Sequence, residues 1–363
     1  MLRRSLLSAT ERESLLSIPS NREELIRRYT LSESDFSLVR QHRGAANRLG
    51  FAVQLCYMRY PGIVLEPGKE PFAPMLSVVA AQLKVEPERW AEYGLRDATR
   101  REHLLEIEAA FGFRPFTVQH YRTAIDDLVG LAWQTDKGVV LAEAMIESLR
   151  KQHILLPSAA VIERICAEAI TPANRRIYAA LTESFSQEHR QRLDQLLTRK
   201  DGGSPTWLAW LRQSPARPNS RSMLEHIDRL KAWEAVDLSA GMDKRVPHNR
   251  MLKIAREGAP MTAADLAKFE PLRRYATLAS LVIEGRATVI DEIIGLHDQV
   301  IGKIFQAAKN RHEQQFQESG KAINQKLRLY ARVGQALLEA RKPARMRSPP
   351  SSLSCRGMRL QPV

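Results

Sequence analysis

Residues 28–62 constrain the fold more than any other segment, because they predict two helices joined by a tight corner. The first helix is expected from about Ser32 to Gln41, since serine hydroxyls readily cap helix starts. The second is expected from Ala45 to about Tyr57, with apolar residues spaced to form one face. The tripeptide His42-Arg43-Gly44 predicts the corner between them, since glycine adopts positive φ at little cost.

Two interpretations of this helix pair remain open. A helix-turn-helix packs its second helix by one stripe and presents Arg, Asn or Gln to base edges from the other face. The side chains that would then contact DNA are Arg43, Asn47, Arg48 and Gln54. However, Phe51, Leu55 and Met58 make the second helix apolar on most sides, as in a buried helical hairpin. The pattern suggests DNA binding without establishing it.

The charge balance favours a polyanionic partner. Lysine and arginine number 55 against 41 for aspartate and glutamate, which gives a net charge of +14. A basic surplus strengthens association with nucleic acid through counterion release and electrostatic steering. Six of the basic residues lie in residues 341–363, which contain no acidic residue, so the rest of the chain carries a more moderate excess. Charge alone is therefore weak support for DNA binding.

Several classes of protein do not fit the sequence. The apolar runs, such as residues 128–133, are too short to span a bilayer. Cys56, Cys166 and Cys355 are too widely separated for a disulfide framework or a CxxC zinc pair. No phosphate-binding glycine loop, GxSxG nucleophile motif or HExxH zinc motif occurs. We expect a cytoplasmic, nucleoid-associated chain with no membrane partner, small-molecule substrate, metal or cofactor.

The whole chain is expected to be all-α, because helical periodicity dominates and no long alternating run predicts a sheet. A loop with four prolines at residues 60–74 and breaks at 200–220 predict four parts. These are a helix-turn-helix-like DNA-binding module at 1–62, a second helical DNA-binding module at 75–200, a helical scaffold or third DNA-contacting region at 220–342, and a disordered basic tail at 343–363. Separate helices are expected at 158–170 and 172–183, and at 271–310 and 313–341.

Three further segments are candidates for contacting DNA. The helix start near residue 99 offers Arg100, Arg101 and His103, the next helix offers Gln119 and Arg122, and the basic run 244–256 offers Lys244, Arg245 and Arg250. Helix amino termini also favour phosphate binding. Solvated helix faces explain the same residues almost as well. Contacts of this kind hold a protein on the phosphates more than they read sequence.

Long stretches of the chain resemble the amino-terminal region of Tn3-family transposases. The similarity rests on TLSESDFSLVRQHRGAANRLGFAVQLCYMRYPG, on the later segment that contains TRREH, on PHNRMLKIAREG and on RLYARVGQALLEAR, and it extends over about residues 1–342. The resemblance implies an all-helical region that binds double-stranded DNA at the transposon's terminal inverted repeats. By position it implies DNA contacts at Gln41, His42, Arg43, Asn47 and Arg48, and in a second module at Arg100, Arg101 and His103.

Family members are about three times longer, and the resemblance places their Asp-Asp-Glu triad outside this sequence. Such a triad would hold two Mg²⁺ ions for strand cleavage and transfer. We therefore expect a truncated transposase that recognises DNA without being an enzyme by itself. Two alternatives remain: an all-α scaffold that pairs with intact transposase, including as a transposase homodimer, and a truncated gene product without function.

Overall fold

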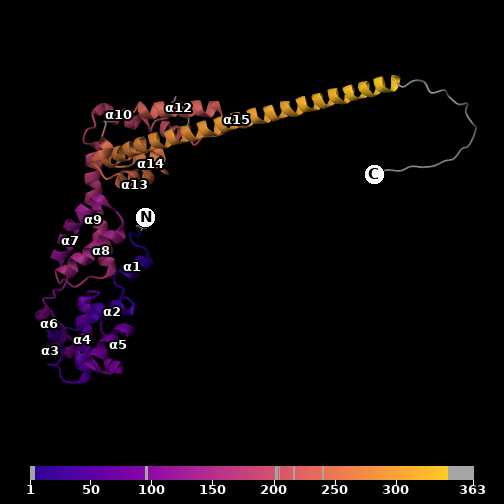
Figure 1. Cartoon of the computed structure of the whole chain (residues 1–363). Helices are drawn as coiled ribbons and strands as arrows, with labels where there is room; N and C mark the ends of the chain where they lie inside the picture. The colour runs from indigo at the N-terminus through magenta and orange to yellow at the C-terminus, as the bar shows by residue number, and fades with distance from the viewer. Residues whose placement is uncertain are drawn as a thin grey trace, which may run out of the picture. The chain divides into compact units, whose positions relative to one another are not determined.

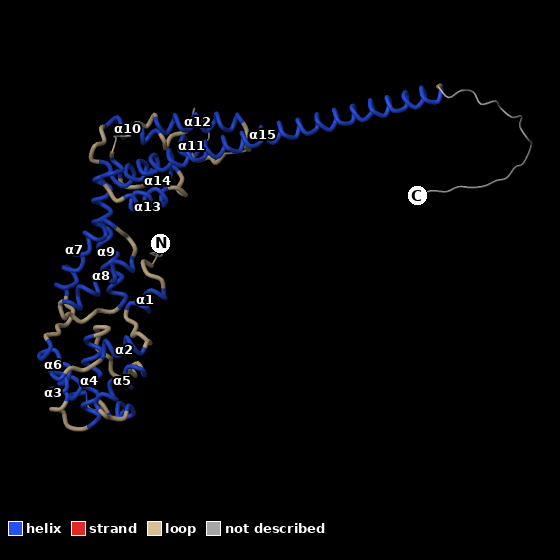
Figure 2. Tube along the Cα trace, in the orientation of Figure 1, coloured by secondary structure: helices blue, strands red, loops and turns tan. Residues whose placement is uncertain are grey.

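The computed structural model describes residues 5–94, 97–200, 203, 205–215, 217–238 and 241–341. All regular elements in these residues are helical, and Figure 2 shows no strand among them. Extended pairing is limited there to isolated bridges, between Arg114 and Ile154 and between Arg199 and Thr206. The predicted all-α fold is confirmed. The tail predicted to be disordered, 343–363, lies outside the described residues.

The first hydrophobic core is built around one central helix, α4 (Ala45–Arg59), in which every residue from Leu49 to Met58 is buried. Around it lie α2 (Arg22–Tyr29), α3 (Glu33–Val39), α5 (Ala73–Leu83) and α6 (Asp97–Phe111), which Figure 1 labels. The 3-10 helix η1 (Pro87–Glu92) also packs against α4. Met75 on α5 and Ile107 on α6 belong to the same core. One core therefore spans the predicted boundary between residues 62 and 75, because α4 is covered only when α5 and α6 pack on it.

The second core lies in α7 (Val118–Gln134), α8 (Gly138–Lys151) and α9 (Ala159–Thr182). The predicted break at Pro172 is wrong, because α9 continues through the proline. Proline removes one backbone hydrogen bond from a helix interior. Here Ala169 and Ala173 on either side are completely buried, and they continue one apolar stripe. Packing of that stripe outweighs the missing hydrogen bond.

The amino-terminal segment belongs to the second core and not to the first. The Glu163 carboxylate on α9 accepts hydrogen bonds from Ser5 Oγ at 2.7 Å, from the Leu6 amide at 2.7 Å and from Arg12 Nε at 2.8 Å. Burial raises the pKa of Glu163, but these hydrogen bonds outweigh it and lower the pKa to about 2. Arg12 lies on α1 (Ala9–Leu15), so a charged carboxylate anchors that helix.

The two cores are joined at the end of α4. Arg150 Nε on α8 donates a hydrogen bond to the Pro61 carbonyl at 2.8 Å, and the Leu156 amide donates one to the Gly62 carbonyl at 2.7 Å. Gly62 has φ of 102°, and a Cβ there would lie 3.1 Å from the Leu156 side chain. The guanidinium groups of Arg28 and Arg150 both lie over the Tyr60 ring, 3.9 and 4.5 Å from its centre.

The remaining helices are α10 (Gln187–Gln195), α11 (Trp207–Leu211), α12 (Ser220–Glu234), η3 (Met242–Arg245), α13 (His248–Gly258), α14 (Ala263–Ala267) and α15 (Pro271–Ala340). The chain divides into two compact units, Met1–Ser214 with Ile227–Asp291 and Pro215–His226 with Glu292–Val363. The two helices predicted at 271–310 and 313–341 are one continuous helix, α15, as Figure 1 shows. None of the helices in the described residues is long and apolar enough to cross a membrane.

Candidate nucleic-acid interface

The predicted helix pair and its glycine corner are confirmed. Ser32 Oγ accepts a hydrogen bond from the Asp35 amide at 3.3 Å, and the Asp35 carboxylate accepts one from the Ser32 amide at 2.8 Å, which is a capping box at the start of α3. Gly44 has φ of 86°, a conformation that favours glycine, and α4 begins at the next residue. Local sequence therefore determines both the start of α3 and the turn into α4.

A buried ion pair fixes the angle between the two helices. Arg59, at the end of α4, donates hydrogen bonds to both oxygens of Asp35, whose side chain is completely buried. Burial alone raises the pKa of Asp35, but the hydrogen bonds from Arg59 and Ser32 outweigh it, so the pKa lies below its ordinary value. Bidentate pairing of this kind adds geometric specificity to electrostatic attraction.

A cluster of aromatic rings lies directly behind the corner and connects it to α6. The His42 ring lies 4.3 Å from both the Phe51 ring and the His103 ring, measured between centroids. Tyr93 stacks on His103, and its hydroxyl lies 3.2 Å from His103 Nδ1. Burial, followed by the neighbouring His42, lowers the pKa of His103 to about 4. Close approach of the Tyr93 ring requires Gly50, since a Cβ there would lie 2.0 Å from it.

The corner exposes a group of basic and amide side chains, which we call the corner surface. It consists of Arg40, Gln41, Arg43, Asn47 and Arg48, and we group with it Arg101, which is exposed on the neighbouring helix α6. Gln41 and Arg43 are exposed, and Arg48 is half-buried. Asn47, also half-buried, donates a hydrogen bond to the Arg43 carbonyl at 3.1 Å. Arg101 is exposed on α6, which reaches the corner through the contact between His42 and His103.

Sequence reasoning missed one member of this surface. Arg40 is exposed at the end of α3, and its guanidinium lies 5.5 Å from the centre of the Phe36 ring. The signal that could have found it is its position: it is a basic residue in the last turn of the predicted helix, two positions before the predicted corner. The predicted contact His42 is half-buried in the ring cluster, where its Nε2 lies 3.5 Å from Glu106 Oε1.

Four residues predicted to contact DNA have buried side chains. Gln54 is completely buried, and its amide donates to the Leu65 carbonyl at 3.4 Å. Arg100 and His103 are 8% and 5% exposed, since the first turn of α6 packs against the ring cluster. Arg250 is 3% exposed and pairs with Asp136 at 3.1 Å. All four side chains contribute to packing inside the protein.

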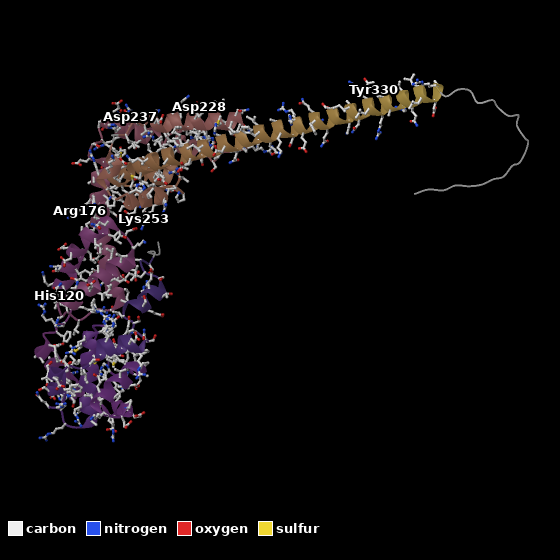
Figure 3. The ribbon with its side chains drawn as sticks, in the orientation of Figure 1. His120, Arg176, Asp228, Asp237, Lys253 and Tyr330 are labelled. Atoms are coloured by element: carbon white, nitrogen blue, oxygen red, sulfur yellow. The ribbon has the colours of Figure 1, made fainter. Side chains whose placement is uncertain are left out.

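The other predicted contacts are exposed but belong to different elements. Gln119 and Arg122 lie in the first turns of α7, near His120, which is labelled in Figure 3. Lys244 and Arg245 lie in η3, where Arg245 Nη1 is 3.5 Å from Glu183 Oε2. These four residues therefore stay candidates outside the corner surface. Over the described residues, no group of three or more His, Cys, Asp or Glu side chains is placed to hold a metal ion.

Fold and surface together define the class: an all-helical chain whose rigidly supported basic corner has chemistry suited to a polyanion. Residues 6–169 match a family model described as a domain of unknown function, DUF4158. The chain is 66% identical over 342 residues to the transposase for transposon Tn3926 of Escherichia coli. The aligned region covers 94% of this chain and 34% of that protein.

Similarity extends to more distant relatives. The transposase for transposon Tn501 of Pseudomonas aeruginosa is 54% identical over 94% of this chain and 35% of its own length. The transposase for transposon Tn1546 of Enterococcus faecium is 28% identical over 93% of this chain and 34% of its own length. This chain belongs to the Tn3 family of transposases and corresponds to their amino-terminal part. It spans about a third of the length of these curated relatives.

Proposed function

We propose that this chain binds double-stranded DNA with its corner surface, and that its target is the terminal inverted repeat of a transposon. The observation that carries the proposal is the corner surface itself: four arginines and two amide side chains, exposed or half-buried, at a corner held by buried contacts and on the neighbouring helix α6. The relatives are named as transposases for particular transposons, which supports transposon DNA as the target.

The accessible part of α4 determines how the corner could read DNA. Residues 49–58 are buried, so at the corner only the first turn of α4, which includes Asn47 and Arg48, is available to a ligand. In helix-turn-helix proteins the amino-terminal residues of the second helix are the ones that contact base edges. Arginine pairs with guanine and glutamine or asparagine with adenine in the major groove. We assign this role to Asn47 on α4 and to Gln41 and Arg43, which lie just before it in the corner.

The remaining arginines are suited to the phosphates on either side. Arg40 at the end of α3 and Arg101 on α6 are exposed, and they lie on two elements that each pack against α4. Each phosphate that a basic side chain neutralises releases counterions and makes binding depend on salt. The amino terminus of α4 adds backbone N–H groups, because Gly44 provides no side-chain cap.

The test is fluorescence anisotropy with a labelled duplex that carries the transposon's terminal inverted repeat, compared with a scrambled duplex of the same composition. The variant Arg43→Ala with Arg101→Ala should weaken binding to the repeat by about 1–3 kcal/mol for each specific interaction that it removes. The control is Lys69→Ala with Lys151→Ala, which also removes two exposed positive charges, here paired with Glu66 and Glu147.

Each outcome of this experiment has a defined meaning. Equal affinity for the repeat and the scrambled duplex would contradict recognition of the repeat. Equal weakening in the corner variant and the control would show that the corner surface is not the interface. In this proposal the chain recognises DNA and does not cleave it, so nicking of the repeat duplex in the presence of Mg²⁺ would contradict that part.

A further inference from the structure

Two arginine side chains lie over the ring of Tyr60, at the place where the two cores meet. Arg28 is in the last turn of α2, and its guanidinium lies 3.9 Å from the centre of the ring. Arg150 is on α8, and its guanidinium lies 4.5 Å from the same centre. The attraction between each cation and the aromatic ring favours this arrangement. Two positive charges from helices far apart in the sequence therefore share one ring.

No acidic side chain of the described part of the chain balances these two charges. There, no carboxylate lies within 4.0 Å of either guanidinium, whereas Arg59 in the first core pairs with Asp35. The Nη2 atom of Arg150 is buried without a hydrogen-bond partner. Burial lowers the pKa of Arg150, the charge on Arg28 lowers it further, and the neighbouring tyrosines offset part of this. A negatively charged group with hydrogen-bond acceptors would relieve the repulsion between the two cations.

The backbone around the ring is held in place by hydrogen bonds from both cores. Tyr29 Oη donates to the Tyr60 carbonyl at 3.1 Å, and Arg150 Nε donates to the Pro61 carbonyl at 2.8 Å. Arg28 is exposed, whereas Tyr60 and Arg150 are half-buried. A ligand from solvent can therefore reach Arg28 directly, and Arg150 supplies a second positive charge in a fixed position behind it. Such preorganisation lowers the cost of binding.

The chemistry of the two side chains favours a phosphate group as the ligand. A guanidinium presents parallel N–H groups that match two oxygens of a phosphate or a carboxylate. The two oxygens of a carboxylate lie in one plane, whereas phosphate oxygens diverge in a tetrahedron and can accept from guanidinium groups on different helices. The net charge of +14 also favours polyanions that carry phosphate.

We propose that Arg28 and Arg150 form a phosphate-binding site at the junction of the two cores, with Tyr60 as the platform that holds both guanidinium groups. The site is separate from the corner surface, because Tyr60 follows the last residue of α4 and the corner precedes the first. The 15 residues of α4 separate the two by about 22 Å. One turn of B-DNA is about 34 Å long, so one duplex is long enough to reach both. A DNA backbone and free phosphate offer the same chemistry, and the experiment separates them.

The first test is the rate at which phenylglyoxal modifies each arginine of the full chain, measured by mass spectrometry of its peptides. Inorganic phosphate should slow modification of Arg28 several-fold, and potassium chloride of the same ionic strength should not. Arg27 is the internal control, because it is exposed in the same turn of α2 but does not lie over a ring. An equal effect of phosphate on both residues, or no effect on Arg28, would overturn the proposal. No DNA is present, so the result does not depend on the corner surface.

The second test identifies the source of the phosphate with a duplex of random sequence. If the source is DNA, the duplex should protect Arg28, and Arg28→Gln should reduce the slope of log affinity against log salt by about 1. The matched control Arg27→Gln should leave the slope unchanged. Protection of Arg28 by inorganic phosphate but not by the duplex would support the site and assign it to free phosphate. Modification of Arg43 in the same samples reports on the corner surface, so failure of one site is distinguished from failure of the other.

Discussion

Arg59 and Asp35 close the helical corner through two parallel hydrogen bonds, from Nη1 to Oδ2 at 2.7 Å and from Nη2 to Oδ1 at 2.5 Å. Asp35 also accepts the Ser32 amide, so one carboxylate both caps α3 and holds the far end of α4. The corner surface therefore depends on a charge that never contacts solvent. A polar pair at this position sets the angle between helices whose apolar faces could pack in several ways.

Asp35→Asn should lower the free energy of unfolding by roughly 2–4 kcal/mol, because it leaves the Arg59 guanidinium without its charged partner. The effect is moderated because the Arg59 side chain is 32% exposed. Urea denaturation followed by circular dichroism measures it. Glu66→Gln is the control, since the pair with Lys69 is exposed on both sides and should change stability by less than about 1 kcal/mol. Similar destabilisation in both variants would contradict a structural role for the buried pair.

Acidification should destabilise the first core through His103. Its pKa falls from an ordinary value of 6.5 to about 4 in the folded protein. The unfolded chain therefore takes up this proton first, and stability falls as the pH drops from about 6.5 to 4, by up to about 3 kcal/mol. Replacing His103 with phenylalanine should remove that part of the pH dependence, measured by urea denaturation at a series of pH values.

The lowered pKa of Asp35 affects stability in a different pH range, below that of His103. Its contribution is complete above its ordinary pKa of 3.8 and is lost only as the pH falls below it. The His103→Phe variant should therefore keep the decline in stability at the most acidic pH values. An unchanged pH profile between 6.5 and 4 in this variant would show that another group titrates there.

Gly50→Ala should destabilise the protein, because the new methyl group would lie 2.0 Å from the Tyr93 ring and displace it from His103. Overpacking of a core typically costs about 1–3 kcal/mol. Gly130→Ala provides the opposite control: no atom lies within 4 Å of its Cβ, and the residue is exposed in the interior of α7. That change should stabilise by roughly 0.5–1 kcal/mol, because alanine favours helix. Thermal denaturation shows whether each variant is less or more stable than the original protein.

The salt dependence of DNA binding should separate the two roles assigned to the corner surface. Arg101→Ala should weaken binding to all duplexes alike and reduce the slope of log affinity against log salt by about 1, as expected for a phosphate contact. Gln41→Ala should weaken binding to the repeat alone and leave the slope unchanged. Identical behaviour of the two variants would contradict the division between phosphate and base contacts.

The helix pair was predictable because its signals are local. The Ser32 cap, the positive φ of Gly44 and the apolar stripe of α4 depend on residues within a few positions of each other. The single long α15 was harder to predict. Helical periodicity continues through residues 311–312, and no proline or glycine there indicates whether the helix ends or continues. Pro172 led to the opposite error. Its local chemistry predicts a helix break, but tertiary packing keeps α9 continuous through it.

Buried side chains occur among the predicted contacts for one physical reason. Gln54 lies on the face of α4 opposite its apolar stripe, so helical spacing alone predicts exposure. A sequence does not show that helices from later in the chain cover that second face. Likewise, Arg100 and Arg250 resemble surface arginines until their buried surroundings are seen. Exposure is a property of the whole fold, so the local pattern identified the corner but not all of its exposed residues.

The proline-rich loop at residues 60–74 has a consequence for how this region can be exchanged between related transposases. It is an obvious joint in the sequence, yet one hydrophobic core continues across it, from Leu49 to Met75 and Ile107. A crossover within the loop would combine two halves of a core that were not selected together. Recombination that preserves stability should instead join chains after Phe111, so that α3, α4 and α6 are inherited as one block. Swapping target specificity by a cut at residue 62 should yield chimaeras that fold poorly.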